Sequence, residues 1–328
     1  MKIKVSELIV KYMERLGIET IFGMPGAHIL PVYDSLYDSG IESILAKHEQ
    51  GAAFMACGYA KASGRISACI TTAGPGATNL VTGIANAFAD KQPILIITGE
   101  TSTTIFGKGG LQESSGEGGS IDQGELFRSI TRYSKLIERT DYLAQVLNQA
   151  SKILLSANPG PVLLSLPFNV QKELVDADIL RNIKTKRHVY AVDKNSPPVD
   201  ALAQQISEAK HPVILAGYGC IKSGAQDIVS QLSKSLNIPV ATSLKGKGVI
   251  GDASELSLGS LGVTSDGRAY RYIVQQADMV LFLGAGFNER TSYLWDQKIL
   301  RNKKIAQIDS DPAQLEKVFE GDVAIQGD

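Results

Sequence analysis

Four short segments carry residue types that could bind or activate a ligand. They are residues 23–28 (GMPGAH), 48–51 (HEQG), 74–79 (GPGATN) and 110–113 (GLQE). Each one follows a run of aliphatic and β-branched residues that predicts a strand. In a parallel sheet the carboxyl ends of the strands share one edge, where ligands usually bind. The sequence therefore predicts a site that combines one acid, Glu49, with closely approaching glycine turns.

Each segment also has a purely structural explanation. Glycines after strands are often only turns, and Gly74 and Gly76 would allow a strand to turn into its helix. An acid such as Glu49 is favoured at a helix start by the helix dipole, whether or not it takes part in chemistry. One segment alone therefore does not identify a function, and the interpretation depends on the combination.

Strands and helices are predicted to alternate along the chain. Apolar runs predict strands at residues 20–22, 43–46, 68–72, 94–98 and 162–166, with helices between them at 29–39, 51–63, 77–89 and 142–156. A second series follows, with strands at 213–216, 240–242, 280–283 and 305–308 and a helix at 225–236. Strands that are apolar throughout and separated by helices indicate parallel sheets covered on both faces. The predicted fold class is α/β, with two doubly wound parallel-sheet domains.

A stretch without periodicity separates the two series. Residues 176–198 end in Asn195, Ser196, Pro197 and Pro198, and consecutive prolines favour an extended chain and oppose a helix. We therefore expect a first domain at 1–175, a linker at 176–198 and a second domain at 199–328. The Gly- and Ser-rich segment 107–119 is expected to be a mobile loop. Residues 323–328 are expected to be a strand near the end of a truncated or split polypeptide.

Composition argues against several classes of protein. The 328 residues are 44% hydrophobic, and a formal net charge of −1 offers no general attraction for nucleic acid or an anionic membrane. No apolar run approaches the roughly 18 residues of a membrane span, and the N-terminus predicts an amphipathic helix instead of a signal peptide. Cys57, Cys69 and Cys220 show no metal-binding spacing, so no metal ligand is predicted in this chain. Isolated thiols in apolar surroundings favour the cytoplasm.

Taken together, the segments resemble a known family. The run HEQGAAFMACGYAKASGRISACITTAGPGATN resembles the pyrimidine-binding domain of acetohydroxyacid (acetolactate) synthases and related thiamine-diphosphate enzymes, including the interval from Glu49 to Gly74. FGMPGAHILPVYDSL and ADKQPILIITGE are similar to the opening loop and a later strand of that domain. HPVILAGYG, IPVATSLKGKGVIG, ADMVLFLGAGFNERTS and IAQIDSDP are similar to the family's central domain. The resemblance covers nearly the whole chain.

The resemblance implies that thiamine diphosphate is the cofactor. It places the Glu49 carboxyl beside the aminopyrimidine, where it would favour the tautomer that removes the thiazolium C2 proton. The other cofactor-binding residues that it implies are Pro25, Gly26, Thr72, Pro75 and Asn79. Small residues such as Gly26 would allow the backbone to approach a flat ring closely.

The resemblance also implies residues that face a 2-oxo acid. Gln112 matches a glutamine that faces the substrate in synthases. His28 stands where synthases carry a small apolar residue, so it could donate a proton to a bound intermediate or simply pack on the next helix. The loop GKGGLQESSGEGGS departs from the synthase pattern, so carboligation and simple decarboxylation both stay open.

The resemblance further implies that this chain is part of an active site. Family members bind the diphosphate and Mg²⁺ through a third domain marked by G-D-G, whereas Gly251 and Asp252 are followed here by Ala253. We therefore expect no decarboxylation by this chain alone, and a homodimer or tetramer completed by the missing domain or a partner chain. FAD in the central domain is possible but not favoured, because Gly286 stands where synthases place an arginine, and an ADP-like ligand or an empty pocket would fit as well. A non-catalytic nucleotide-binding or assembly module is the alternative from another class.

Overall fold

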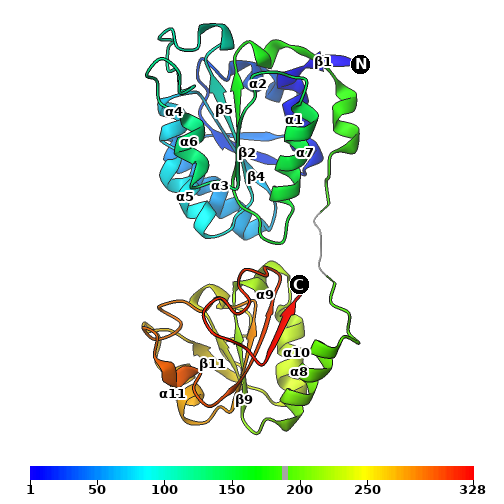
Figure 1. The fold of residues 1–328 in the computed structure, drawn as a ribbon, viewed down its shortest axis with the longest axis vertical. Coiled ribbons are helices and arrows are strands. Elements are labelled where there is room, and N and C mark those ends of the chain that lie inside the picture. Colours follow the sequence, from blue (N-terminus) through cyan, green and yellow to red (C-terminus); the bar gives the residue numbers. More distant parts are fainter. Residues whose placement is uncertain (187–190) are drawn as a thin grey trace. The chain divides into compact units, whose positions relative to one another are not determined.

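The chain forms two compact units, which span Met1–His188 and Val189–Asp328. The computed structural model describes residues 1–186 and 191–328, so residue 188, a histidine without an expected role, lies outside the described residues. Each unit is an α/β domain in which helices flank a parallel sheet (Figure 1). The fold class expected from the sequence is therefore confirmed, whereas the domain limits at 175 and 199 stay predictions.

The first unit is built on a six-stranded sheet in the order β3-β2-β4-β5-β7-β6, in which all neighbours are parallel. Its strands are β2 (Thr20–Gly23), β3 (Glu42–Leu45), β4 (Ser67–Thr71), β5 (Ile94–Glu100), β6 (Tyr133–Leu136) and β7 (Val162–Pro167). The central strands β4 and β5 are buried at every residue, as expected for strands covered on both faces. A separate antiparallel pair joins β1 (Lys2–Lys4) to β8 (Leu174–Asp176).

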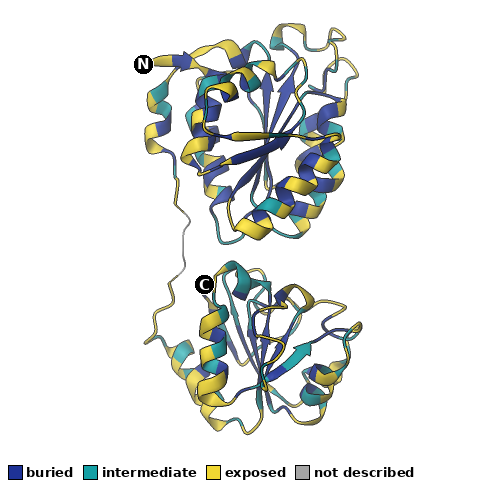
Figure 2. Ribbon diagram, turned by 180° about the vertical axis from the view of Figure 1, so that it is seen from behind, coloured by how far each residue is buried: buried dark blue, intermediate teal, exposed yellow. Residues whose placement is uncertain are grey.

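Two layers of helices cover this sheet, and each layer closes a separate core (Figures 1 and 2). One layer consists of α1 (Val5–Arg15), α2 (Leu30–Tyr37) and α7 (Leu143–Leu154). The other consists of α3 (Glu49–Ser63), α4 (Pro75–Thr78), α5 (Val81–Ala89) and α6 (Gln123–Arg128). Successive residues of β5 point to opposite cores, since Leu95 and Ile97 join the first cluster and Ile96 the second.

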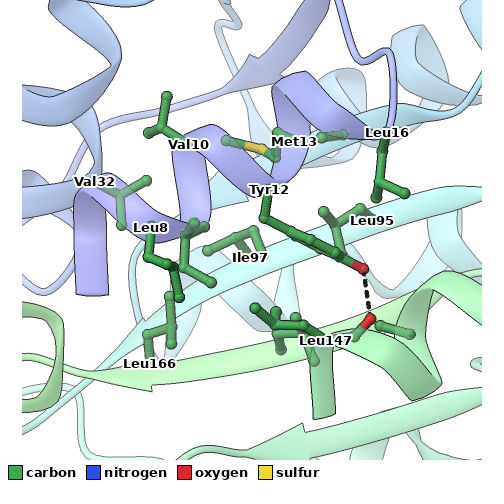
Figure 3. Packing of buried hydrophobic residues seen from close by; sticks show 14 of the residues in the cluster. Leu8, Val10, Tyr12, Met13, Leu16, Val32, Leu95, Ile97, Leu147 and Leu166 are labelled. Atoms are coloured by element: carbon green, nitrogen blue, oxygen red, sulfur yellow. Dashed lines mark hydrogen bonds between the residues drawn. The ribbon is translucent and has the colours of Figure 1, made fainter. Parts of the chain in front are cut away.

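The amphipathic N-terminal helix expected from the sequence is confirmed as α1. Leu8 and Tyr12 are fully buried and lie in one cluster with Leu95 (Figure 3). The Tyr12 hydroxyl donates to Leu147 O at 3.0 Å and lies 2.9 Å from Ser151 Oγ. This buried polar group is therefore satisfied, and it ties α1 to α7.

The second unit has a six-stranded parallel sheet of its own, in the order β11-β10-β9-β12-β13-β14. Its strands are β9 (Pro212–Ala216), β10 (Val240–Thr242), β11 (Ser257–Ser260), β12 (Met279–Leu283), β13 (Lys304–Asp309) and β14 (Val323–Gln326). Its helices are α8 (Pro197–Glu208), α9 (Tyr218–Lys222), α10 (Gln226–Leu236) and α11 (Arg268–Gln275). Residues of α8 and α10 join the core on one face of the sheet and residues of α11 the core on the other.

Several local expectations are corrected by the structure. The consecutive prolines do not oppose a helix, because Pro197 is the first residue of α8, where its missing N–H would have no partner anyway. The helix expected at 77–89 is divided into α4 and α5. The strands β1, β6, β8 and β11 are not predicted from the sequence. All the strands that were predicted are present, with ends shifted by no more than two residues.

Candidate functional site

The loops that carry the four predicted segments meet where the strand order of the first sheet reverses. From β2 the chain runs outward to β3 and then returns to β4 on the other side of β2. Such a reversal opens a crevice at the carboxyl ends of the strands, the usual ligand site of an open α/β sheet. Gly26 follows β2, Glu49 follows β3, Thr72 follows β4, and the loop after β5 carries Gln112.

Glu49 is the first residue of α3 and is only 8% exposed. Asn79 Nδ2 donates a hydrogen bond to Glu49 Oε2 at 2.9 Å. The second carboxylate oxygen, Oε1, accepts no hydrogen bond from the described residues and faces Gly76, where an added Cβ would lie 3.6 Å away. The carboxylate is thus held on one side and open on the other.

His48 immediately precedes Glu49 at the start of α3. Its side chain is exposed and caps α3, since its Nδ1 accepts a hydrogen bond from Gln50 N at 3.1 Å. A side-chain acceptor at this position satisfies one of the unpaired N–H groups of the first helical turn. His48 therefore fixes the start of α3, and with it the place of Glu49.

Thr72 joins the turns around the site. A Cβ on Gly26 would lie 2.6 Å from Thr72 Cβ, and a Cβ on Gly76 would lie 2.8 Å from Thr72 Cγ2, so both turns require glycine. Thr72 Oγ1 accepts a hydrogen bond from His28 N at 3.3 Å. The same hydroxyl donates to Gln112 Oε1 at 3.4 Å. One side chain therefore connects the loops that follow β2, β4 and β5.

Gln112 has a backbone φ of 55°, in the left-handed region that glycine favours. An added Cβ on Gly74 would lie 3.0 Å from Gln112 O, so the loop rests directly on the turn after β4. The adjacent Glu113 accepts hydrogen bonds from Gly107 N at 2.5 Å and Gly110 N at 2.9 Å. The pKa of the Glu113 carboxyl is lowered, and the hydrogen bond from the Gly107 N–H is the largest cause. The loop thus has internal hydrogen bonds, and its mobility stays a prediction.

His28 is half-buried, and its backbone passes closely over β5. A Cβ on Gly99 would lie 2.3 Å from His28 O, and that carbonyl accepts a hydrogen bond from Gln171 Nε2 at 2.6 Å. The ring atom Nδ1 is buried and has no hydrogen-bond partner among the described residues. A buried, unpaired ring nitrogen is the kind of group that a ligand can satisfy.

The rim of the site is open to solvent. Pro25, Pro75 and Asn79 are exposed, whereas Gly76 is buried beneath them. Pro75 begins α4, and the break after this short helix lets the Asn79 side chain reach Glu49. These contacts therefore bring the loops that carry the predicted residues together, with the acid buried and the two prolines exposed.

A second concave site lies at the carboxyl edge of the other sheet. A pocket of about 460 Å³ is lined by Tyr218, Ser243, Leu244, Lys245, Leu261, Gly284, Gly286, Asn288, Arg290 and Thr291. It lies where the order of that sheet reverses, between β9 and β12. Lys245 and Arg290 had no role assigned from the sequence, although both follow predicted strands.

Two other features, a membrane-spanning helix and a cluster of metal ligands, are absent from the described parts of the chain. Over residues 1–186 and 191–328, no helix combines the length and apolar character needed to cross a membrane. Over the same residues, no group of three or more histidine, cysteine or acidic side chains could hold a metal ion. Cys57, Cys69 and Cys220 are buried thiols, as their apolar surroundings predicted.

Comparison with known proteins decides the family. Residues 3–120 match the thiamine pyrophosphate enzyme N-terminal TPP binding domain, and residues 199–328 match the thiamine pyrophosphate enzyme central domain. The chain belongs to the thiamine pyrophosphate enzyme family. The first matched segment contains every site residue predicted from the sequence.

The relatives of this thiamine pyrophosphate enzyme chain include acetolactate synthase large subunits. It is 37% identical over 329 residues to the probable acetolactate synthase large subunit of Methanocaldococcus jannaschii, a match that covers 99% of this chain and 54% of that protein. It is also 37% identical to the acetolactate synthase isozyme 1 large subunit of Escherichia coli K12, over 98% of this chain and 55% of that protein. The chain thus spans about half the length of the curated relatives that it matches.

Proposed function

We propose that this chain supplies the pyrimidine side of a thiamine-diphosphate site that acts on 2-oxo acids, with Glu49 as its catalytic residue. The observation that carries the proposal is the state of the Glu49 carboxylate. It is buried, Asn79 holds Oε2, and no described residue donates to Oε1. A carboxyl group fixed in this way can hold or transfer a proton at a heteroaromatic nitrogen that approaches its open side.

The other residues of the crevice fit a flat heteroaromatic ring. Gly26 and Gly76 let two turns pack closely against Thr72, and Gly76 places no side chain beside Glu49 Oε1. The exposed rim at Pro25 and Pro75 leaves a path by which a ligand can enter. When bound, thiamine diphosphate supplies the electron sink for cleaving a bond next to a carbonyl group.

Two residues of the crevice are proposed to face the substrate. The Gln112 side chain meets Thr72 at the centre of the site and can present its amide to a 2-oxo acid. His28 has a buried, unpaired Nδ1 and can donate or accept a proton there. Whether the product is a carboligated acid, as for the acetolactate synthase relatives, or a free aldehyde is decided by product analysis.

The direct test is Glu49→Gln in the holoenzyme assembled with a diphosphate-binding domain. We expect this change to abolish hydrogen–deuterium exchange at C2 of thiamine diphosphate, because an amide cannot cycle a proton as a carboxyl group does. Glu7→Gln is the matched control, since Glu7 also lies in the first turn of a helix but away from the crevice. Near-normal exchange in Glu49→Gln would leave Glu49 with only a helix-dipole role.

The pocket of the second unit is proposed to bind a nucleotide. Lys245 and Arg290 bring positive charge to its wall, which suits a diphosphate, and Gly284 and Gly286 line it without side chains. Of the two candidate nucleotides, ADP is preferred and FAD is the less favoured ligand. A flavin absorbance band in the purified protein would reverse that preference.

The intact enzyme is proposed to be a cytoplasmic homo-oligomer, a dimer or a tetramer. Mg²⁺ and the diphosphate are proposed to be held by the diphosphate-binding domain that the resemblance implies, since the matches of this chain are to the family's N-terminal and central domains. We propose that the active site is shared between chains, as the resemblance implies. Sedimentation analysis of the assembled enzyme tests the oligomeric state.

A further inference from the structure

A second acid, Glu100, is buried next to the site but takes no part in the proposed chemistry. It is the last residue of β5 and is 1% exposed. Its Oε1 accepts hydrogen bonds from Thr101 N at 2.8 Å and Ser114 N at 3.1 Å, and its Oε2 accepts one from Ser114 Oγ at 2.6 Å. Burying a carboxylate is energetically unfavourable unless hydrogen bonds satisfy it, so these three donors stabilise Glu100 in its buried position.

Ser114 connects this carboxylate to the candidate site. The side chain is 3% exposed, and its Oγ accepts a hydrogen bond from Gly74 N at 3.4 Å. The same oxygen lies 3.2 Å from Oε1 of Gln123, whose amide donates to Thr98 Oγ1 at 2.7 Å. Buried polar groups linked in this way restrain one another, because leaving any member unpaired is unfavourable.

The restrained segment is the one that carries Gln112. The loop from β5 to α6 leaves Glu100 and returns to it at Ser114, two residues beyond Gln112. Gln112 has its left-handed φ of 55° within this closed segment, and its carbonyl is packed against Gly74. A non-glycine residue keeps such a conformation only where its surroundings impose it.

We propose that Glu100 is a positioning residue whose carboxylate, acting through Ser114, holds the loop so that Gln112 stays against Thr72 and Gly74. The inference rests on the proposed function only in the role of Gln112 toward the substrate. The hydrogen bonds between Glu100 and Ser114 that hold the loop, called the latch below, are a property of the folded chain. The latch makes Glu100 and Ser114 determinants of how the substrate side of the crevice is shaped.

Hydrogen–deuterium exchange of the full 328-residue chain tests the latch without any activity. Glu100→Ala is expected to accelerate exchange of the amides of Thr101 and Ser114, and of the loop between them, by about tenfold or more, because their charged acceptor is lost. Ser114→Ala is the milder variant and should accelerate the same amides. Glu100→Gln should stay near the wild-type rate, since its amide oxygen still accepts both N–H groups and its NH₂ can donate to Ser114 Oγ.

The matched control is Ser151→Ala, which removes another fully buried serine hydroxyl, bonded to Leu147 O in α7. It is expected to accelerate exchange in α7 and α1 and to leave the loop unchanged. Unchanged loop exchange in both Glu100→Ala and Ser114→Ala would overturn the proposal. So would an acceleration spread evenly over the whole first unit, because that pattern indicates general loss of stability.

The assembled holoenzyme then separates the latch from the proposed function. Glu100→Ala is expected to raise KM for the 2-oxo acid or lower its turnover by about tenfold, while C2 exchange stays near the wild-type rate. Loss of C2 exchange in Glu100→Ala would overturn the inference, because the damage would then reach Glu49. Normal C2 exchange in Glu49→Gln, with the loop still released in Glu100→Ala, would remove the proposed function and leave the latch standing.

Discussion

Gly76 offers a quantitative test of the geometry around Glu49. In Gly76→Ala the new methyl group would lie 2.8 Å from Thr72 Cγ2, about 1 Å inside the normal separation of two carbon atoms. Thr72 is β-branched and its hydroxyl is engaged with His28 and Gln112, so rotating the side chain away would break those contacts. Overpacking of this kind costs about 1 to 3 kcal/mol.

Part of this cost is offset by helix propensity. Gly76 lies in α4, where alanine is favoured over glycine by up to about 1 kcal/mol. The net expectation is that Gly76→Ala lowers the free energy of unfolding by about 1 to 2 kcal/mol. Urea denaturation, monitored on the first unit, measures this change.

A double variant identifies the cause of the strain. Thr72→Ser removes Cγ2 and keeps the hydroxyl, after which the nearest neighbours of the new methyl, Glu49 Oε1 and Thr72 Cβ, lie at an ordinary 3.6 Å. Gly76→Ala combined with Thr72→Ser should therefore be about as stable as Thr72→Ser alone, with a coupling energy of about 1 to 2 kcal/mol.

Gly58→Ala is the control for the same substitution without a clash. Gly58 lies in α3 with nothing within 4 Å of an added Cβ, so alanine there should stabilise the unit by about 0.5 to 1 kcal/mol. The packing of Gly76 on Thr72 would be refuted if Gly76→Ala were as stable as the wild type. It would also be refuted if Thr72→Ser gave no relief.

Two further predictions concern stability away from the crevice. Tyr12→Phe should lower the free energy of unfolding of the first unit, measured in urea, by about 1 to 2 kcal/mol, because the buried hydroxyl that contacts Ser151 is lost. An unchanged free energy of unfolding would contradict a stabilising role of this hydroxyl. Burial raises the pKa of Asp278, but hydrogen bonds from the N–H groups of Lys210 and His211 outweigh it and lower the pKa overall. A carboxyl group whose pKa is lowered by folding stabilises the folded state at pH values above its pKa in the unfolded chain, about 3.9. This stabilisation is lost as the pH falls through the pKa of the folded state. Asp278→Asn should therefore destabilise the second unit at neutral pH, and its difference from the wild type should shrink on acidification below about pH 4; a difference independent of pH would contradict this assignment.

Local patterns were sufficient for the framework of the fold. The strands were predictable because buried parallel strands are continuous apolar runs, and β10 was located to the residue. The less apolar strands β6 and β11 were missed, because their residues are only partly buried in the main and so leave a weak hydrophobic signal. The start of α8 was misread because Pro197 opposes a helix in its interior but suits its first turn.

The candidate site followed from sequence as a set of residue types. Glycine turns and an acid after successive strands must share one edge of a parallel sheet, and the resemblance to thiamine-diphosphate enzymes selected Glu49 among the acids. No local sequence feature distinguishes the acid with the proposed catalytic role from the acid with the proposed positioning role. Glu49 and Glu100 both stand at strand or helix ends, and both are buried.

The sequence by itself determined the order of the elements, the two-domain α/β class and the residues that could act, because these depend on local periodicity and residue type. Only the tertiary structure decided the contacts on which the different roles proposed for those residues rest. Asn79 meets Glu49 because α4 ends one residue before it, and Ser114 meets Glu100 because a long loop closes on itself. Such contacts join residues far apart in the chain, and a hydrogen bond depends on ångström-scale positions that no local pattern specifies.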